Sequence, residues 1–135
     1  MIVIDTHIWI WWVTQSPRFT DSIKAISIKA IIAEHRDQLG LSVYSCWEVA
    51  KLVEKNKLQL HHPVHEWTEK ALDYSKVTLM DLTVPIAIKS TQLEGFHNDP
   101  ADQIIVATAL IHNYPLLTVD KKIVDYEPVR TIEIM

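Results

Sequence analysis

The sequence predicts an α/β fold with a mostly parallel central sheet and helices on both of its faces. Short apolar runs that suit strands alternate along the chain with longer segments whose apolar residues recur at helical spacing. Strands separated by helices imply crossover connections, which make the strands parallel and cover both faces of the sheet. The chain has 135 residues, 48% apolar and 22% charged, and no repeat, low-complexity tract or linker. We therefore expect a single domain over residues 1–135 with a substantial core.

Two strands and three helices are expected in the first half of the chain. They are a strand over 2–5, a helix over 22–36, a strand over 39–44, and helices over 46–55 and 63–74. The first run is short and apolar and ends at an acid, as a buried strand does. In the first helix, Ile23, Ile26 and Ala30 recur at helical spacing, which indicates an amphipathic helix.

The second half is expected to hold the remaining strands and two longer helices. They are a strand over 77–80, helices over 85–93 and 100–113, a strand over 115–119, a short turn or helix, and an edge strand over 130–134. Pro85 and Pro100 each suit the first position of a helix, where the missing N–H of proline costs no hydrogen bond. The sheet therefore has four to five strands.

Composition excludes several classes of protein. Cys46 is the only cysteine, so no intramolecular disulfide can form, and a reducing cytoplasm is the expected location. The chain start has no basic region before its first acid, and no apolar run approaches the roughly 20 residues that span a bilayer. We expect no membrane association. The net charge of −4 also argues against a broadly basic surface that binds nucleic acid by charge alone.

Two common functions of α/β proteins are disfavoured by individual residues. Gly40 and Gly95 are the only glycines, and they cannot form a phosphate-cradling loop. A phosphoacceptor receiver domain needs adjacent acids after its first strand, whereas Asp5 is followed by Thr6.

Four acids lie where an α/β protein would gather metal ligands. Asp5 and Asp120 end apolar, strand-like runs, and Glu48 and Asp102 lie in the first turn of expected helices. Ligands of open α/β folds bind at the carboxyl edge of the sheet, so the four should converge there. No lysine or arginine lies beside Asp5 or Asp102 in the sequence to compensate their charge. Oxygen-only ligands favour Mg²⁺ or Mn²⁺, which would support phosphodiester hydrolysis.

Each acid also has a purely structural interpretation. Ser45 and Glu48 match a capping box, in which the serine caps the helix and the glutamate reaches back to a backbone N–H. Asp99 before Pro100 is a good helix cap. Asp120 could cap the next short helix, and Asp5 could simply end a strand. Asp102 is harder to explain this way, because it shares a helical face with residues that should pack inward.

The four acidic stretches together resemble a known family. MIVIDTHIWIWW, SVYSCWEVAKL, HNDPADQIIVATA and LLTVDKKI are similar to motifs of the PIN-domain nucleases, specifically VapC-type toxins of bacterial toxin–antitoxin pairs, in the same order over essentially the whole chain. The resemblance implies a three-layer α/β/α fold and Mg²⁺- or Mn²⁺-dependent ribonuclease activity. It also implies RNA as substrate, inhibition by a small VapB-like antitoxin, and a homodimer. A catalytically silent PIN scaffold and a housekeeping PIN nuclease without an antitoxin are the alternatives.

The resemblance also assigns the acids. Asp5 and Asp102 match the principal metal-binding aspartates of the family, and Glu48 and Asp120 match the other two acids. Asp99 resembles an additional acid of the motif, in a supporting or capping role.

Hydroxyl and basic neighbours of the acids receive supporting roles. Thr6 and Thr118 are expected to hydrogen-bond a carboxylate or water, or to be structural hydroxyls. Four lysines near the acids are proposed RNA contacts, with a solvated helix face as the alternative: Lys51, Lys55, Lys121 and Lys122.

The histidines and tryptophans leave further possibilities. His61 and His65 have the spacing of a zinc site, but no cysteine or acid completes a known pattern. His7 and His97 lie near the acids in the sequence, either touching substrate or lying in surface loops. Tryptophans concentrate at positions 9, 11 and 12. We expect part of this cluster, with the helix over 22–36, to bury against an antitoxin or a second copy.

Overall fold

A four-stranded, entirely parallel sheet forms the centre of the computed structural model, which describes residues 1–16 and 22–134. The strand order is β3-β2-β1-β4. The strands are β1 (Ile2–Ile4), β2 (Leu39–Ser42), β3 (Thr78–Met80) and β4 (Leu116–Leu117). Each expected strand up to residue 119 is present, and the parallel arrangement is confirmed.

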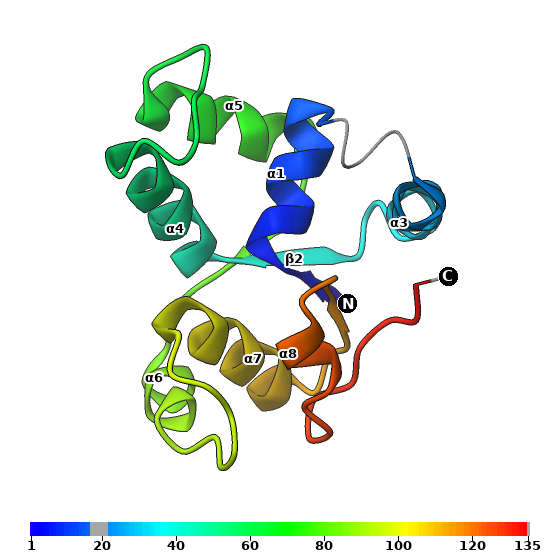
Figure 1. Ribbon diagram of the computed structural model, residues 1–135, viewed down its shortest axis with the longest axis vertical. Helices are drawn as coiled ribbons and strands as arrows, with labels where there is room; N and C mark the ends of the chain where they lie inside the picture. Colours follow the sequence, from blue (N-terminus) through cyan, green and yellow to red (C-terminus); the bar gives the residue numbers. More distant parts are fainter. Residues whose placement is uncertain (17–21, 135) are drawn as a thin grey trace.

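Helices cover both faces of this sheet, so the α/β/α layering is confirmed (Figure 1). Within the described residues they are α1 (Thr6–Thr14), α3 (Ile23–Glu34), α4 (Val43–Glu54), α5 (Val64–Ser75), α6 (Val84–Ser90), α7 (Pro100–His112) and α8 (Lys121–Val124). Helices α1, α4 and α5 lie on one side of the sheet, and α6, α7 and α8 lie on the other (Figure 1). No described helix is long and apolar enough to cross a membrane.

Successive side chains of β1 point to opposite faces of the sheet, and each face has its own hydrophobic core. Ile2 and Ile4 belong to the core beneath α1, α3, α4 and α5, whereas Val3 points into the core beneath α7 and α8. All three side chains are buried, because β1 lies between two strands and both of its faces are covered. A central strand held in this way fixes the position of the residue that follows it, Asp5.

Three expectations about local structure were wrong. Strand β2 ends at Ser42, and α4 begins at Val43, where a longer strand to residue 44 was expected; the Ser42 hydroxyl accepts a hydrogen bond from Tyr44 N at 3.1 Å and caps the helix. Helix α3 exists, but Ile23 and Ile26 are exposed and a different stripe of the helix faces the core. That stripe comprises Ala25, Ile28 and Ile32.

The third wrong expectation concerns the C-terminal segment, where an edge strand was expected. Thr131 forms only an isolated parallel bridge with Leu116 of β4. Two backbone hydrogen bonds accompany it, from Leu116 N to Arg130 O at 2.9 Å and from Ile132 N to Leu116 O at 3.0 Å. The segment therefore runs along the β4 edge without extending the sheet by a full strand.

Candidate active site

Asp5 lies at the carboxyl end of β1 and also begins α1. Its Oδ1 accepts a hydrogen bond from Thr6 N at 2.8 Å, and its Oδ2 accepts one from the Thr118 hydroxyl at 2.6 Å. Its backbone N donates to Leu117 O at 3.0 Å, which ties the end of β1 to the end of β4. Burial raises the pKa of the Asp5 carboxyl, and the hydrogen bond from Thr118 offsets part of that rise. The fold therefore holds this carboxyl group rigidly in a place where its charge is costly.

Thr118 connects two of the acids. It follows β4 directly, is buried, and its hydroxyl accepts a hydrogen bond from Asp120 N at 3.0 Å while donating to Asp5. Asp120 caps α8, with its Oδ1 accepting from Lys122 N at 2.9 Å. The expected hydrogen bond between Thr118 and a carboxylate is present. The capping interpretation of Asp120 is also correct, and it leaves the other carboxylate oxygen free of a side-chain or backbone donor among the described residues.

Glu48 enters the same site from α4. Because α4 begins at Val43, Glu48 lies in its second turn and not in the first, where it was expected. Its Oε1 is buried and has no hydrogen-bond partner in the described part of the protein. Burial raises the pKa of the Glu48 carboxyl; the nearby Thr6 hydroxyl lowers it, and the charge of Asp5 raises it further.

The capping box proposed for Glu48 is absent. Ser45 lies inside the helix, buried, and its hydroxyl accepts a hydrogen bond from the Thr6 hydroxyl at 2.8 Å. Ser42 is the residue that caps α4. Glu48 therefore has no structural task at the helix end that would account for its burial.

Asp102 lies in the first turn of α7, as expected. Asp99 caps this helix by accepting hydrogen bonds from Ala101 N at 3.0 Å and Asp102 N at 3.2 Å. The Asp102 side chain is only 13% exposed, and its Oδ2 lies 3.1 Å from His97 Nε2. Burial, followed by the charges of Asp5 and the other nearby acids, raises the pKa of Asp102 to about 8.

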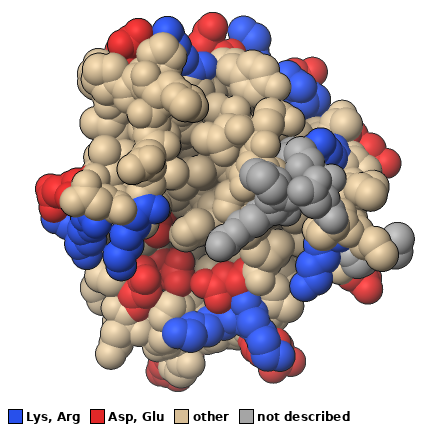
Figure 2. Space-filling view, turned by 45° about the horizontal axis from the view of Figure 1, so that its top comes forward, with Lys and Arg blue, Asp and Glu red and all other residues tan. Residues whose placement is uncertain are grey.

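The four acids therefore converge on the carboxyl edge of the sheet, where His97, beside Asp102, is the one basic side chain among the described residues that forms an ion pair with any of them. Figure 2 shows acidic side chains gathered in a hollow of the surface, with basic side chains on two sides of it. Among the described residues, no lysine or arginine forms an ion pair with any of the four. In the described part of the chain, no group of three or more His, Cys, Asp or Glu side chains is already arranged to hold a metal ion. The acids are close enough for their charges to raise one another's pKa values.

The predicted lysines flank this edge. Lys51 of α4 and Lys55, which directly follows this helix, line a cavity of about 240 Å³ that Glu48 and Asp99 also line. Lys121 directly follows Asp120 and forms an ion pair with Asp125 at 3.5 Å. Lys122 is exposed. Sequence reasoning missed Trp47, which lines the same cavity; the signal was its position beside Glu48 and one helical turn before Lys51.

The zinc site considered for the histidines is not formed. His62 and His65 lie on the surface of α5 or just before it, 3.8 Å from Glu66 and 3.0 Å from Glu69. His61 is exposed as well. These are surface pairs at helical spacing, and they belong to no metal-binding group among the described residues.

The tryptophans at the start of the chain belong mainly to the protein's own core. Trp9 and Trp12 are buried, and Trp9 packs edge-on against Trp67 with ring centroids 5.4 Å apart. Trp11 is half-buried. The expected partner surface therefore cannot include Trp9 or Trp12, whereas Ile23 and Ile26 of α3 remain exposed.

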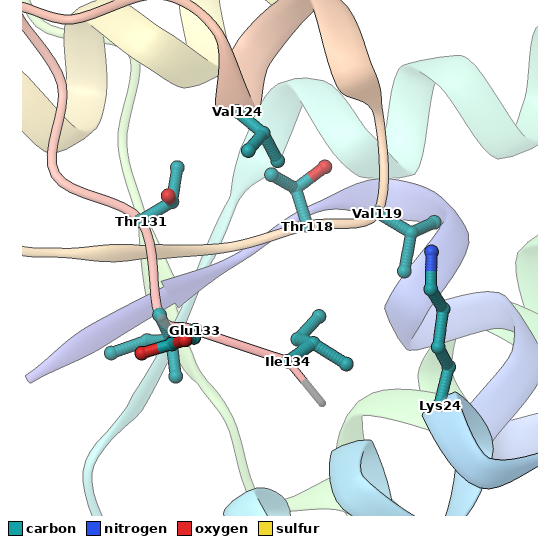
Figure 3. A pocket seen from close by; sticks show the side chains of 8 residues that line it. Lys24, Thr118, Val119, Val124, Thr131, Glu133 and Ile134 are labelled. Atoms are coloured by element: carbon teal, nitrogen blue, oxygen red, sulfur yellow. The ribbon is translucent and has the colours of Figure 1, made fainter.

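A second cavity, of about 270 Å³, lies between α3 and the C-terminal segment (Figure 3). Lys24 of α3 and Ile134 of the C-terminal segment border it, and Thr118 and Val119 lie on its wall. None of the four acids lines it. It is therefore a different cavity from the one that Glu48 and Asp99 line.

Comparison with known proteins gives one family and several similar structures. The sequence model of the PIN domain matches residues 2–127. Ribonuclease VapC22 of Mycobacterium tuberculosis is 29% identical over 134 residues, which cover 98% of this chain and 97% of that protein. VapBC2 from Rickettsia felis, solved with a DNA fragment from its promoter, has a TM-score of 0.70 at 16% identity, with 100% of both chains covered. A toxin–antitoxin complex from Klebsiella pneumoniae has a TM-score of 0.66 at 22% identity, again with 100% of both chains covered. At such identities the two structures establish the shared fold.

Proposed function

Because this chain belongs to the PIN domain family, we propose that it is a ribonuclease that hydrolyses RNA phosphodiester bonds and acts as the toxin of a toxin–antitoxin pair. A curated relative that spans nearly the whole chain is a ribonuclease by name. Similar solved structures are toxin–antitoxin complexes. The observation that carries the proposal is the gathering of four acids, without a lysine or arginine partner among the described residues, at the sheet edge where α/β proteins bind ligands.

The donor set suits a hard divalent cation. All four side chains offer oxygen, the Oε1 atom of Glu48 is buried without a hydrogen-bond partner among the described residues, and Asp102 has its pKa raised to about 8 by burial and by like charges. A bound cation would remove both penalties at once, because it supplies the missing partner and the missing opposite charge. Asp5, Glu48, Asp102 and Asp120 would hold Mg²⁺ or Mn²⁺. When bound, such an ion polarises a phosphoryl oxygen and lowers the pKa of a water.

The neighbouring polar residues position these ligands. Thr118 donates to Asp5 Oδ2 and accepts from Asp120 N, so it fixes one acid relative to the other. Asp99 holds the first turn of α7, on which Asp102 lies. Thr6 holds the start of α1 against α4 through Ser45. Groups of this kind orient metal ligands, and their loss typically costs about 10- to 100-fold in metal affinity or activity.

We propose a small VapB-like antitoxin as the inhibitor and a homodimer as the assembly. Apolar side chains lie exposed on two helices, Ile23 and Ile26 on α3 and Val84 on α6, at 76%, 64% and 71% exposure. Such residues suit protein interfaces. The similar structures from Klebsiella pneumoniae and Rickettsia felis support the antitoxin, because they are a toxin–antitoxin complex and a VapBC complex.

Cleavage of total cellular RNA tests the proposal. The protein is purified free of any antitoxin and assayed with Mg²⁺, Mn²⁺ or EDTA, as wild type, Asp5→Asn and Asp125→Asn. Asp125 is a matched control, because it is an exposed acid that pairs with Lys121 outside the site. We expect metal-dependent cleavage by the wild type and by Asp125→Asn, and none by Asp5→Asn. No cleavage by any of the three, with no metal binding by calorimetry, would instead favour a silent scaffold.

The toxin role has its own test. A small reading frame overlapping the start of this gene should encode a protein that abolishes cleavage at stoichiometric amounts. Metal-dependent cleavage without such a neighbour would favour a housekeeping nuclease.

A further inference from the structure

A groove beside the acidic site carries an aromatic side chain and three lysines. The cavity of about 240 Å³ lies between α4 and the start of α7. Glu48 and Asp99 line it on the side of the acids, and Trp47 lines it together with Lys51, Lys55 and Lys57. Because Glu48 belongs to both, the groove and the acidic site are continuous. A substrate that spans them would have one part at the acids and its neighbour beside Trp47.

Trp47 is exposed for a residue of its size, at 49%. Its ring lies against Tyr44 with centroids 4.8 Å apart, and Lys51 Nζ lies 5.9 Å from its centroid. The tryptophan therefore packs against a second aromatic ring, and the end of the flexible Lys51 side chain also lies near its ring. An exposed and supported indole offers a face on which a planar group can stack.

The three lysines bring positive charge to a protein of net charge −4. Lys51 pairs with Glu54 at 2.7 Å, but Lys55 and Lys57 form no ion pair with a described residue. The acids repel phosphate, so a polyanionic substrate needs local cations next to them. Lysines beside an aromatic ring are the combination with which proteins bind single-stranded nucleic acid.

We propose that this groove binds the nucleotide next to the scissile phosphate, with an unpaired base stacked on Trp47 and the adjoining phosphates held by Lys55 and Lys57. The proposal rests on the ribonuclease function proposed above. A base inside a duplex already has neighbours on both faces, so only a single-stranded or looped segment can place a base on Trp47. Trp47 is then a determinant of substrate form, and the lysines supply affinity.

Binding of a fluorescently labelled single-stranded RNA oligonucleotide, measured by anisotropy, tests this groove. Asp5→Asn serves as the parent so that the probe stays intact, and the same sequence in a duplex is measured beside it. Trp47→Ala should weaken single-strand binding by roughly 5- to 100-fold, the range for loss of one stacked base. Trp47→Phe should keep most of the affinity, and duplex binding should not respond to either change. Tyr74→Ala is the matched control, since Tyr74 is 53% exposed on α5 and also lies beside a tryptophan.

The lysines are tested through the dependence of binding on salt. Changing Lys55 and Lys57 together to glutamine should lower the salt slope by roughly 0.7 per lysine. Lys70→Gln is the control, because Lys70 lies on α5 and pairs with Glu66.

In cleavage assays, Trp47→Ala should raise KM more than it lowers kcat, which a general loss of folding would not do. Single-strand binding by Trp47→Ala equal to that of the parent overturns the stacking proposal, and cleavage by the wild type in the same experiments would leave the ribonuclease function standing. A wild type that neither binds nor cleaves RNA overturns both.

Discussion

Helix α4 carries two glutamates in opposite surroundings. Glu54 is exposed and accepts a hydrogen bond from Lys51 at 2.7 Å, which lowers the pKa of its carboxyl. Glu48, on the same helix, is largely buried, its Oε1 has no partner among the described residues, and burial raises its pKa. The first is an ordinary surface ion pair of small effect. Glu48 lies in surroundings that favour the neutral form of its carboxyl group.

The same contrast holds between whole regions. On α5, Glu66 lies 3.2 Å from Lys70, and Glu69 lies 3.0 Å from His65. At the carboxyl edge of the sheet, Asp5 and Asp102 have raised pKa values and no lysine or arginine partner among the described residues. Lysines are available nearby, on α4 and α8, and pair with other acids. Among the described acids, the carboxyl groups with raised pKa values all lie at this edge, which suits a site that takes its cation from solution.

Removing the charge of Glu48 or of Glu54 should give the largest difference between the two surroundings. Glu48→Gln keeps the shape of the side chain but removes the charge of a proposed metal ligand, so RNA cleavage should fall to the background level. Glu54→Gln should cleave within about twofold of the wild type, because a surface ion pair contributes little. The measurement is the initial rate of cleavage with saturating Mn²⁺. Equal losses in the two variants would mean that Glu48 has no special role.

Thr118→Val should have the next largest effect. It removes the hydroxyl that donates to Asp5 Oδ2 at 2.6 Å, while it keeps a branched side chain of similar size. Cleavage should fall by about 10- to 100-fold if Asp5 is a metal ligand as proposed, because that is the usual effect of losing a residue that orients such a ligand. Thr118→Ser retains the hydroxyl and should recover most of the activity. If the serine variant were as impaired as the valine variant, packing and not the hydrogen bond would be the cause.

The stability of the metal-free protein should depend on the ionisation of Asp102. Its pKa is raised from 3.8 to about 8, so the fold favours the neutral acid. This contribution to stability is fully present below pH 3.8 and is lost as the pH rises towards 8. In EDTA, Asp102→Asn should therefore stabilise the protein at pH 8, by on the order of 2 kcal/mol or roughly 5 °C in Tm.

Added Mn²⁺ should have the opposite effect on stability and offset the loss at high pH. The ion should raise the Tm of the wild type more at pH 8 than at pH 5, because the ionised carboxylates are its proposed ligands. Thermal melts at both pH values, with and without Mn²⁺, measure the two effects. A Tm of the wild type that rises with pH in EDTA between pH 5 and 8 would contradict the account of Asp102.

The smallest effect is expected from Lys51→Gln. Without the ammonium group, the pKa of Glu54 should rise towards its ordinary value, whereas the raised pKa of Glu48 should persist because burial is its main cause. Carboxyl chemical shifts followed by NMR during a pH titration report both groups. A change in Glu48 as large as that in Glu54 would show that the two environments are linked.

Much of this arrangement could be predicted from the sequence, because its signals are local. Apolar runs that end at Asp5 and near Asp120 identified the strands that carry those acids. Proline at position 100, after Asp99, identified the start of α7 and so the place of Asp102. These signals need only strand ends and helix caps, which neighbouring residues determine.

Where prediction failed, distant contacts decided the outcome. Ser42 and Ser45 are both plausible caps for α4, and the pairing of Ser42 with Met80 at the end of β2 selects Ser42. Helix α3 has two apolar stripes, and its docking against the sheet buries Ile28 and Ile32 and leaves Ile23 exposed. Neither choice is visible in a window of a few residues.

Calorimetric titration of the wild type with Mn²⁺ at pH 7, in two buffers of different ionisation enthalpy, tests the central claim most directly. Because Asp102 has a pKa of about 8, the metal-free site should hold a proton at this pH and release it when the ion binds. The account predicts saturable binding with proton release in the wild type and in Glu54→Gln, and loss of both in Glu48→Gln. Binding of equal affinity in Glu48→Gln, or no binding by the wild type, would contradict it.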